Sequence, residues 1–214
     1  MTAWSSQRVS AVVVLMVVLG LLAGCSGGSE PAASSSAVPV SSTASPSASA
    51  PSTTTVAAAP YKPADLNGPA QNVPKPVKPA LADEFSEKGL DTFARFWYTA
   101  YNFGVETGDT SLAGQMALSE CTRCTAILTN TKDWYASGKW IIGTALTVTS
   151  TKPSFVQAAN GAYQVLIQYN TAAGKYASAG TAGVDEPGST ARGDVVNAIY
   201  QNGQWRIIDI GKPI

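Results

Sequence analysis

Residues 90–101 read LDTFARFWYTAY, and this stretch decides the fold of the chain. Apolar side chains recur in steps of three and four, as at Leu90, Phe93 and Trp97, which places them on one stripe of a helix. Acidic residues precede the stretch and complement the positive end of a helix dipole. The sequence therefore predicts a long amphipathic helix whose apolar face needs a partner layer.

Two shorter helices are expected next. Thr107-Gly108-Asp109 predicts a break, after which Asp109 or Thr110 can cap a short helix that runs to about Leu118. Ser119 can cap a third helix, and Ser137-Gly138 ends it because glycine supplies a left-handed terminator.

Beyond Gly143 the apolar period changes from 3.6 to two, which is the pattern of β-strands. Residues 145–148 and 163–169 predict two strands connected through Asn160-Gly161. The glycine-rich residues 172–189 predict an extension of one strand, followed by a long exposed loop around Pro187-Gly188.

The last two strands are predicted most sharply. Residues 195–200 and 205–210 flank Asn202-Gly203, and this dipeptide between apolar runs is the strongest short hairpin signal. Helices followed by antiparallel strands indicate an α+β domain over residues 81–214, with N-terminal helices packed on a curved antiparallel sheet. That length is sufficient for one core and too small for two.

The order of these elements resembles known families. The helix around residues 93–103, the following Thr107-Gly108-Asp109 and the closing Asn202-Gly203-Gln204-Trp205 are similar to the cystatin-like or nuclear-transport-factor-2-like cone fold. With Cys121-Thr122-Arg123-Cys124, the pattern resembles more narrowly an actinobacterial lipoprotein family, domain-of-unknown-function family 6318. The resemblance covers residues 81–214 and implies a fold and a location, but no reaction.

The N-terminus carries the pattern of a bacterial lipoprotein signal. Arg8 precedes an apolar run over residues 9–22, and Leu22-Ala23-Gly24-Cys25 closes it. As a helix the run spans about 21 Å, too short for a hydrocarbon core of about 30 Å. We therefore expect residues 1–24 to be a signal peptide and Cys25 to be lipidated, with the protein held on the extracytoplasmic face of the cell membrane. A buried core helix or a signal cut without lipidation is the alternative interpretation.

Residues 25–80 are rich in Ser, Ala, Thr and Pro, and most of the chain's 13 prolines lie there. Such a segment has too few large apolar residues to offset its chain entropy, so we expect a disordered tether. The alternatives are a glycosylated segment or a wall-contact motif in the Lys-Pro repeats of residues 74–79.

Charge and composition exclude several function classes. The chain has 14 basic and 14 acidic residues, which offers no basic stripe for nucleic acid. It contains no histidine, so no Ser-His or Cys-His nucleophile pair can form. We expect no metal site and no cofactor, because zinc needs four ligands and only two cysteines remain beyond Cys25.

Those two cysteines, Cys121 and Cys124, are predicted to form a disulfide outside the cytoplasm. At positions i and i+3 of a helical turn their Cα atoms lie about 5 to 5.5 Å apart, which a disulfide accepts. Thiol exchange is the competing interpretation, with Arg123 adding positive charge, but it needs the pair at a helix N-terminus after a strand.

Asp209 is the weak catalytic candidate. By period two it shares a strand face with Trp205 and Ile207, and a carboxylate beside apolar groups could transfer protons together with a tyrosine. Pairing with Arg192 or Arg206, or a place at the sheet rim, is the non-catalytic interpretation.

Aromatic residues surround the first helix on all sides, more than one buried face requires. The set consists of Phe93, Phe96, Trp97, Tyr98, Tyr101 and Phe103. Most are expected in the core, and some are expected to be exposed or to line a cavity. The sequence thus favours a lipid-anchored, non-catalytic envelope module that binds a small apolar ligand or an envelope protein. A cone-fold isomerase or hydrolase using Asp209 is the rival, and thiol exchange is a third option.

Overall fold

The computed structural model describes residues 59–213 of the 214-residue chain. Cys25, the predicted signal peptide and the first part of the predicted tether lie outside the described residues. The helical elements are η1 (Ala80–Asp83), α1 (Glu87–Thr107), α2 (Ser111–Gly114) and α3 (Thr122–Ala136). The strands are β1 (Lys139–Gly143), β2 (Leu146–Ser154), β3 (Tyr163–Thr171), β4 (Gly174–Ser178), β5 (Val184–Glu186), β6 (Ser189–Gln201) and β7 (Gln204–Gly211).

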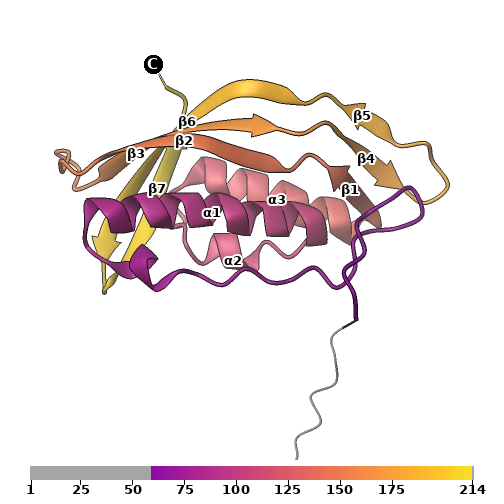
Figure 1. The fold of residues 1–214 in the computed structure, drawn as a ribbon, viewed down its shortest axis with the longest axis horizontal. Coiled ribbons are helices and arrows are strands. Elements are labelled where there is room, and N and C mark those ends of the chain that lie inside the picture. The colour runs from indigo at the N-terminus through magenta and orange to yellow at the C-terminus, as the bar shows by residue number, and fades with distance from the viewer. Residues whose placement is uncertain (1–58, 214) are drawn as a thin grey trace, which may run out of the picture. The chain divides into compact units, whose positions relative to one another are not determined.

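The strands form two antiparallel sheets, with orders β1-β4-β5 and β2-β3-β6-β7. Three strands of the larger sheet continue almost directly into those of the smaller one, and Ala172 N donates to Ala145 O across the junction at 2.9 Å. Figure 1 shows the strands arching over α1, α2 and α3, which all lie on one side of them. The described domain is therefore α+β, with helices on one face of a bent antiparallel array.

Glycines permit the bend between the two sheets. Gly143 has a φ of 70°, and Thr144 beside it has a φ of 61°. A Cβ on Gly174, which pairs with Gly143, would lie 2.1 Å from Ile142 O. Side chains cannot fit where these backbones approach so closely, so the junction needs glycine.

Helix α1 is the central element. Ser86 caps its start by accepting from Gly89 N at 2.9 Å, and Gly108 ends it with a φ of 79°. The buried side chains of α1 face the larger sheet on one side and α2 and α3 on the other, which explains why aromatic residues surround it. The core members from α1 are Leu90, Phe93, Ala94, Phe96, Trp97, Tyr98 and Ala100.

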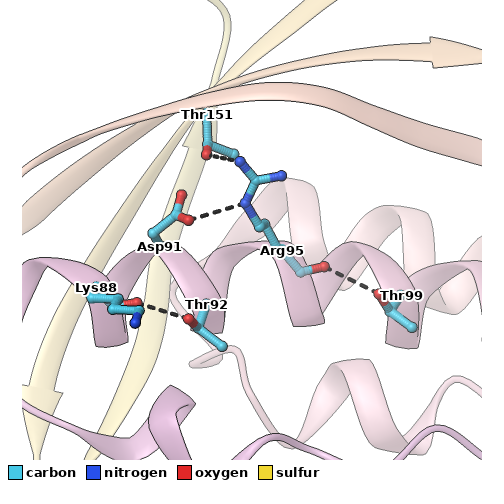
Figure 2. A network of polar contacts seen from close by, with 6 residues as sticks. All are labelled: Lys88, Asp91, Thr92, Arg95, Thr99 and Thr151. Atoms are coloured by element: carbon cyan, nitrogen blue, oxygen red, sulfur yellow. Dashed lines mark hydrogen bonds and ion pairs between the residues drawn. The ribbon is translucent and has the colours of Figure 1, made fainter.

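The outer surface of α1 is tied to β2 by polar contacts. Arg95 Nε donates to Asp91 Oδ2 at 3.0 Å, and its Nη2 donates to the Thr151 hydroxyl (Figure 2). The hydroxyls of Thr92 and Thr99 donate to backbone carbonyls one turn earlier in the helix. Because all these groups are at least partly accessible to water, we assign them an orienting role.

The sequence predictions for the long helix and the last hairpin are confirmed. Asn202 and Gly203 have φ values of 51° and 76°, as a two-residue hairpin turn requires. The exposed loop predicted within residues 172–189 is wrong, because β4 and β5 lie there, with β4 paired to β1 on one side and to β5 on the other. Glycines required at the bend interrupt the alternation of apolar and polar residues in these strands, so the sequence pattern did not reveal them.

Residues 59–80 correct the prediction that order begins at residue 81. Lys62 and Gln71 exchange two backbone hydrogen bonds of 3.0 and 2.9 Å, so the segment 60–72 forms a small loop of its own. Trp140 Nε1 on β1 donates to Asp65 O at 2.7 Å, and Tyr61 bonds Glu106 on α1. Contacts with distant residues, rather than composition, order this proline-rich segment.

Among residues 59–213, no helix is long and apolar enough to cross a membrane.

Candidate ligand-binding cavity

A half-open cavity of about 370 Å³ lies between α1, α3 and the bent strands. Its walls come from both helices and from all three strands of the smaller sheet, so the bend creates the space. The lining residues are Tyr101, Val105, Ile127, Asn130, Thr131, Trp134, Ile141, Thr144, Leu146, Tyr169, Thr171, Tyr176 and Glu186.

Trp134 and Tyr176 form one wall. Their ring centroids are 5.3 Å apart with an interplanar angle of 73°, an edge-to-face pair. Trp134 Nε1 donates to Trp140 O at 3.2 Å, which fixes the indole against β1. The wall is therefore held by packing and by a hydrogen bond before any ligand arrives.

The opposite wall belongs to α1. Tyr101 stacks on Trp97 with an interplanar angle of 5° and a centroid distance of 5.7 Å, so a buried side chain supports it. One turn of helix is pinned to the bend, because Asn102 Nδ2 donates to Leu146 O at 2.7 Å and its Oδ1 accepts from Leu146 N at 3.0 Å. Helix and sheet thus cannot slide past each other at the cavity.

Three tyrosine hydroxyls and one carboxylate add polar character to the cavity. Burial raises the pKa of Tyr101, and the nearby Tyr176 and Tyr169 raise it further. Burial, followed by the Glu186 carboxylate, raises the pKa of Tyr176. These phenols are therefore neutral at physiological pH and can each donate one hydrogen bond.

A buried polar cluster lies near the cavity but outside its lining. Tyr98 on α1 donates to Asp194 Oδ2 on β6 at 2.8 Å. Arg123 Nη2 on α3 lies 2.9 Å from Asp194 Oδ1, yet no well-directed N–H bond reaches that oxygen. Burial and then the Asp194 charge strongly raise the pKa of Tyr98. The cluster joins α1, α3 and β6 electrostatically.

This cluster is poorly placed for catalysis. Tyr98 is 2% exposed and Asp194 4% exposed, and neither lines the cavity between α1, α3 and the bent strands. A substrate could not reach the carboxylate without opening the core. We therefore assign it to the architecture, where the Arg123 cation offsets the charge of a buried carboxylate.

Asp209 does not lie where the strand period predicted. The pairing of β6 with β7 shifts between Asn197 and Ala198, so Ile208 is an extra residue of a bulge. The bulge turns Asp209 to the exposed outer face, where it accepts from Asn197 Nδ2 at 3.3 Å. Its predicted face, shared with Trp205 and Ile207, is wrong, and no ion pair with Arg192 or Arg206 is found among the described residues.

Cys121 and Cys124 form a disulfide with a Cα–Cα distance of 5.2 Å. Cys121, and not the predicted Ser119, is the N-cap of α3, since its Sγ accepts from Cys124 N at 3.2 Å. The pair thus lies at a helix N-terminus, the position that thiol exchange favours. Both cysteines are nonetheless buried, at 0% and 1% exposure, so a partner thiol cannot reach them.

The described residues contain no group of three or more acidic, cysteine or histidine side chains that could hold a metal ion.

A comparison with protein-family models matches residues 59–210 to the family of unknown function DUF6318. The chain belongs to the DUF6318 family. The match begins at the residue where the structure also begins to describe the chain, so the DUF6318 domain includes the segment 60–72. A comparison with curated proteins finds no match.

Sequence reasoning placed one residue of the cavity of this DUF6318 domain in its aromatic set, Tyr101. It missed Trp134 as a wall and it missed Tyr176 and Glu186 altogether. Residues 174–178 read GKYAS, and a single tyrosine in so short a glycine-led stretch gives no alternation from which a strand could be predicted.

Proposed function

We propose that this DUF6318 protein is a lipid-anchored protein of the cell envelope whose domain binds a small organic ligand without transforming it. The observation that carries the proposal is the cavity of about 370 Å³ with four aromatic rings and a few polar groups in its walls. Ligand sites in proteins are concave, mostly apolar and furnished with a small number of placed polar groups. This cavity has that composition.

The size of the cavity limits the ligand. Ligand pockets range from about 300 to 1,000 Å³, so this one is near the lower end and suits a small molecule. Asn130, Thr131 and Thr171 line it and can orient polar atoms of the ligand. The pinned positions of Trp134 and Tyr101 reduce the ordering cost of binding, because the walls are already formed.

The proposed location rests on the sequence. The pattern Leu22-Ala23-Gly24-Cys25 after a short apolar run is that of a lipidation signal, and two acyl chains give stable membrane anchoring. Mass spectrometry of membrane-extracted protein tests this directly. We expect an acylated Cys25 as the N-terminal residue, and an unmodified N-terminus elsewhere would contradict the anchor.

The proposed fold family is the nuclear-transport-factor-2-like cone. Support comes from α1 lying across a bent antiparallel array (Figure 1). The cavity lined by residues of helices and strands supports it too. Tyr176 on β4 and Glu186 on β5 line this cavity from the smaller sheet. The non-catalytic assignment is supported by the lack of histidine and by the exposed position of Asp209.

Blocking the cavity mouth tests the binding function. Asn130 is exposed on α3 and lines the mouth, so Asn130→Trp adds bulk there with little cost to the core. Ala126→Trp, on the exposed surface of the same helix and outside the lining, is the matched control. We expect ligands found by ligand-observed NMR with the wild-type protein to lose binding to Asn130→Trp and to keep it with Ala126→Trp. Equal binding to both variants would contradict the proposal.

A further inference from the structure

Aromatic rings line the cavity, and the face of each ring carries negative electrostatic potential. Tyr101 and Trp134 come from helices and Tyr176 from a strand, and their rings are only partly buried by protein. The π-face of an aromatic ring attracts cations, most strongly for tryptophan. Trp134 already does so, because Lys139 Nζ lies 4.5 Å from the centroid of its ring. These walls favour a positively charged guest.

Glu186 is the one charged side chain among the residues that line the cavity in the described part of the chain. It is partly buried, and it takes part in none of the ion pairs found within residues 59–213. Glu186 pairs with Gly174, two residues before Tyr176 on the neighbouring strand, so the side chains of Glu186 and Tyr176 lie on the same face of the smaller sheet. The cavity therefore contains a negative charge that protein cations leave unbalanced.

Two cations of the same region are paired with other carboxylates. Arg123 pairs with Asp194, and Lys175 pairs with Asp185. Because side chains alternate along a strand, Lys175 and Asp185 point to the opposite face of the smaller sheet from Glu186. Neither Lys139 nor Arg192 lines the cavity. Among residues 59–213, no cation lines the cavity or pairs with Glu186.

We propose that the cavity binds an alkylated ammonium group, with Glu186 as its counter-ion and the rings of Tyr101, Trp134 and Tyr176 as its walls. This inference rests on the proposed ligand-binding function and names the class of ligand. Aromatic surroundings with one carboxylate suit quaternary ammonium groups, which proteins recognise through aromatic cages. A free choline-like molecule and a choline lipid headgroup present the same chemistry.

Two isosteric probes separate charge from shape. Choline and the neutral 3,3-dimethylbutan-1-ol have nearly the same shape, and only choline carries the positive charge. Both are titrated by calorimetry into the full chain in an alkyl maltoside detergent, which contains no ammonium group. We expect choline to bind about tenfold more tightly than the alcohol, the scale of a cation–π site.

Two neighbouring carboxylates supply the matched variants. Glu186→Gln removes the charge inside the cavity, and Asp185→Asn removes one charge on the opposite face, where the side chain is 82% exposed. We expect Glu186→Gln to abolish most of the preference for choline and Asp185→Asn to retain it. Thermal unfolding shows whether both variants fold. If one variant is unfolded, the comparison of the two probes on the wild-type protein still tests the preference for the charged probe.

The outcomes distinguish this inference from the function on which it rests. Equal binding of both probes overturns the cation preference while leaving ligand binding in place. Binding of neither probe overturns the ammonium inference, and the proposed function then depends on the Asn130→Trp comparison alone. Phosphatidylcholine and phosphatidylglycerol vesicles separate the two sources. A Glu186-dependent preference for phosphatidylcholine supports a lipid headgroup, and choline binding without it supports a free small molecule.

Discussion

Arg123 Nη2 lies 2.9 Å from Asp194 Oδ1, and the disulfide between Cys121 and Cys124 encloses Arg123 at the first turn of α3. The guanidinium is about a third exposed, whereas the carboxylate is almost fully buried. A buried charge needs a compensating partner, and Arg123 is that partner for Asp194. The disulfide thus holds the backbone at Arg123, whose positive charge offsets the buried negative charge of Asp194.

Asp194→Asn is expected to lower the free energy of unfolding by about 2 kcal/mol, because it breaks a buried ion pair and weakens the bond from Tyr98. Asp209→Asn is the matched control. It replaces a carboxylate on the exposed outer face and should change the same quantity by less than about 0.5 kcal/mol. Urea unfolding followed by circular dichroism measures both. A larger loss from Asp209→Asn than from Asp194→Asn would refute this assignment.

The double variant Cys121→Ser, Cys124→Ser should be less stable by about 2 kcal/mol, the chain-entropy estimate for so small a ring. Serine at residue 121 keeps an oxygen that can accept a hydrogen bond from the backbone N–H of residue 124, so the helix cap is largely preserved. Urea unfolding gives the difference. Thiol titration of the native wild-type protein should detect no free thiol at these two positions, even with mild reductant, because both are buried. Rapid reduction would instead favour thiol exchange.

Stability should fall as pH rises above about 10. Burial raises the pKa of Tyr98, Tyr101 and Tyr135 above their ordinary value of 10.0. A raised folded pKa stabilises the protein fully below the unfolded pKa, and this contribution is lost as pH increases beyond it. Each such tyrosine adds up to about 1.4 kcal/mol per pH unit to the slope.

The variant Tyr98→Phe tests the largest contribution to that slope. It removes the phenol hydroxyl that donates to Asp194, so the free energy of unfolding falls at neutral pH. Above pH 10 its decrease with pH becomes less steep by the contribution of about one tyrosine. Thermal unfolding between pH 8 and pH 11.5 compares it with the wild type. Identical slopes would show that Tyr98 does not ionise on unfolding.

The segment 60–72 should stabilise the domain. A chain that begins at residue 81 lacks the Asp65 carbonyl that accepts from Trp140, and part of the indole ring becomes exposed. A chain that begins at residue 59 keeps the hydrogen bond and the burial of the ring. Partial exposure of a large aromatic side chain predicts a loss of about 2 kcal/mol. Thermal unfolding of the two truncated chains measures it, and equal stability would restore the boundary at residue 81.

Local patterns predicted the elements whose signals lie within a few residues of one another. The apolar spacing from Leu90 to Trp97 and the Asn202-Gly203 turn are of this kind, and both are confirmed. The α+β class followed from their order. The disulfide followed from a spacing of three residues.

Contacts between distant residues could not be predicted in this way. Tyr98 and Asp194 are 96 residues apart, and Trp140 and Asp65 are 75 apart. A single extra residue in β7 reversed the side of the sheet on which Asp209 lies, because the side-chain period of a strand is two. The cavity depends on the bend between two sheets, which no single stretch of sequence encodes.

The indole N–H signals of the full chain test ligand binding in the cavity most directly. Trp134 lines the cavity, whereas Trp205 is buried near the other end of α1, where its Nε1 donates to Glu84 O at 2.9 Å. On titration with a ligand found by ligand-observed NMR, ¹H–¹⁵N spectra should show a saturable shift of the Trp134 signal and an unchanged Trp205 signal. A shift of Trp205 with no change at Trp134 would contradict the account.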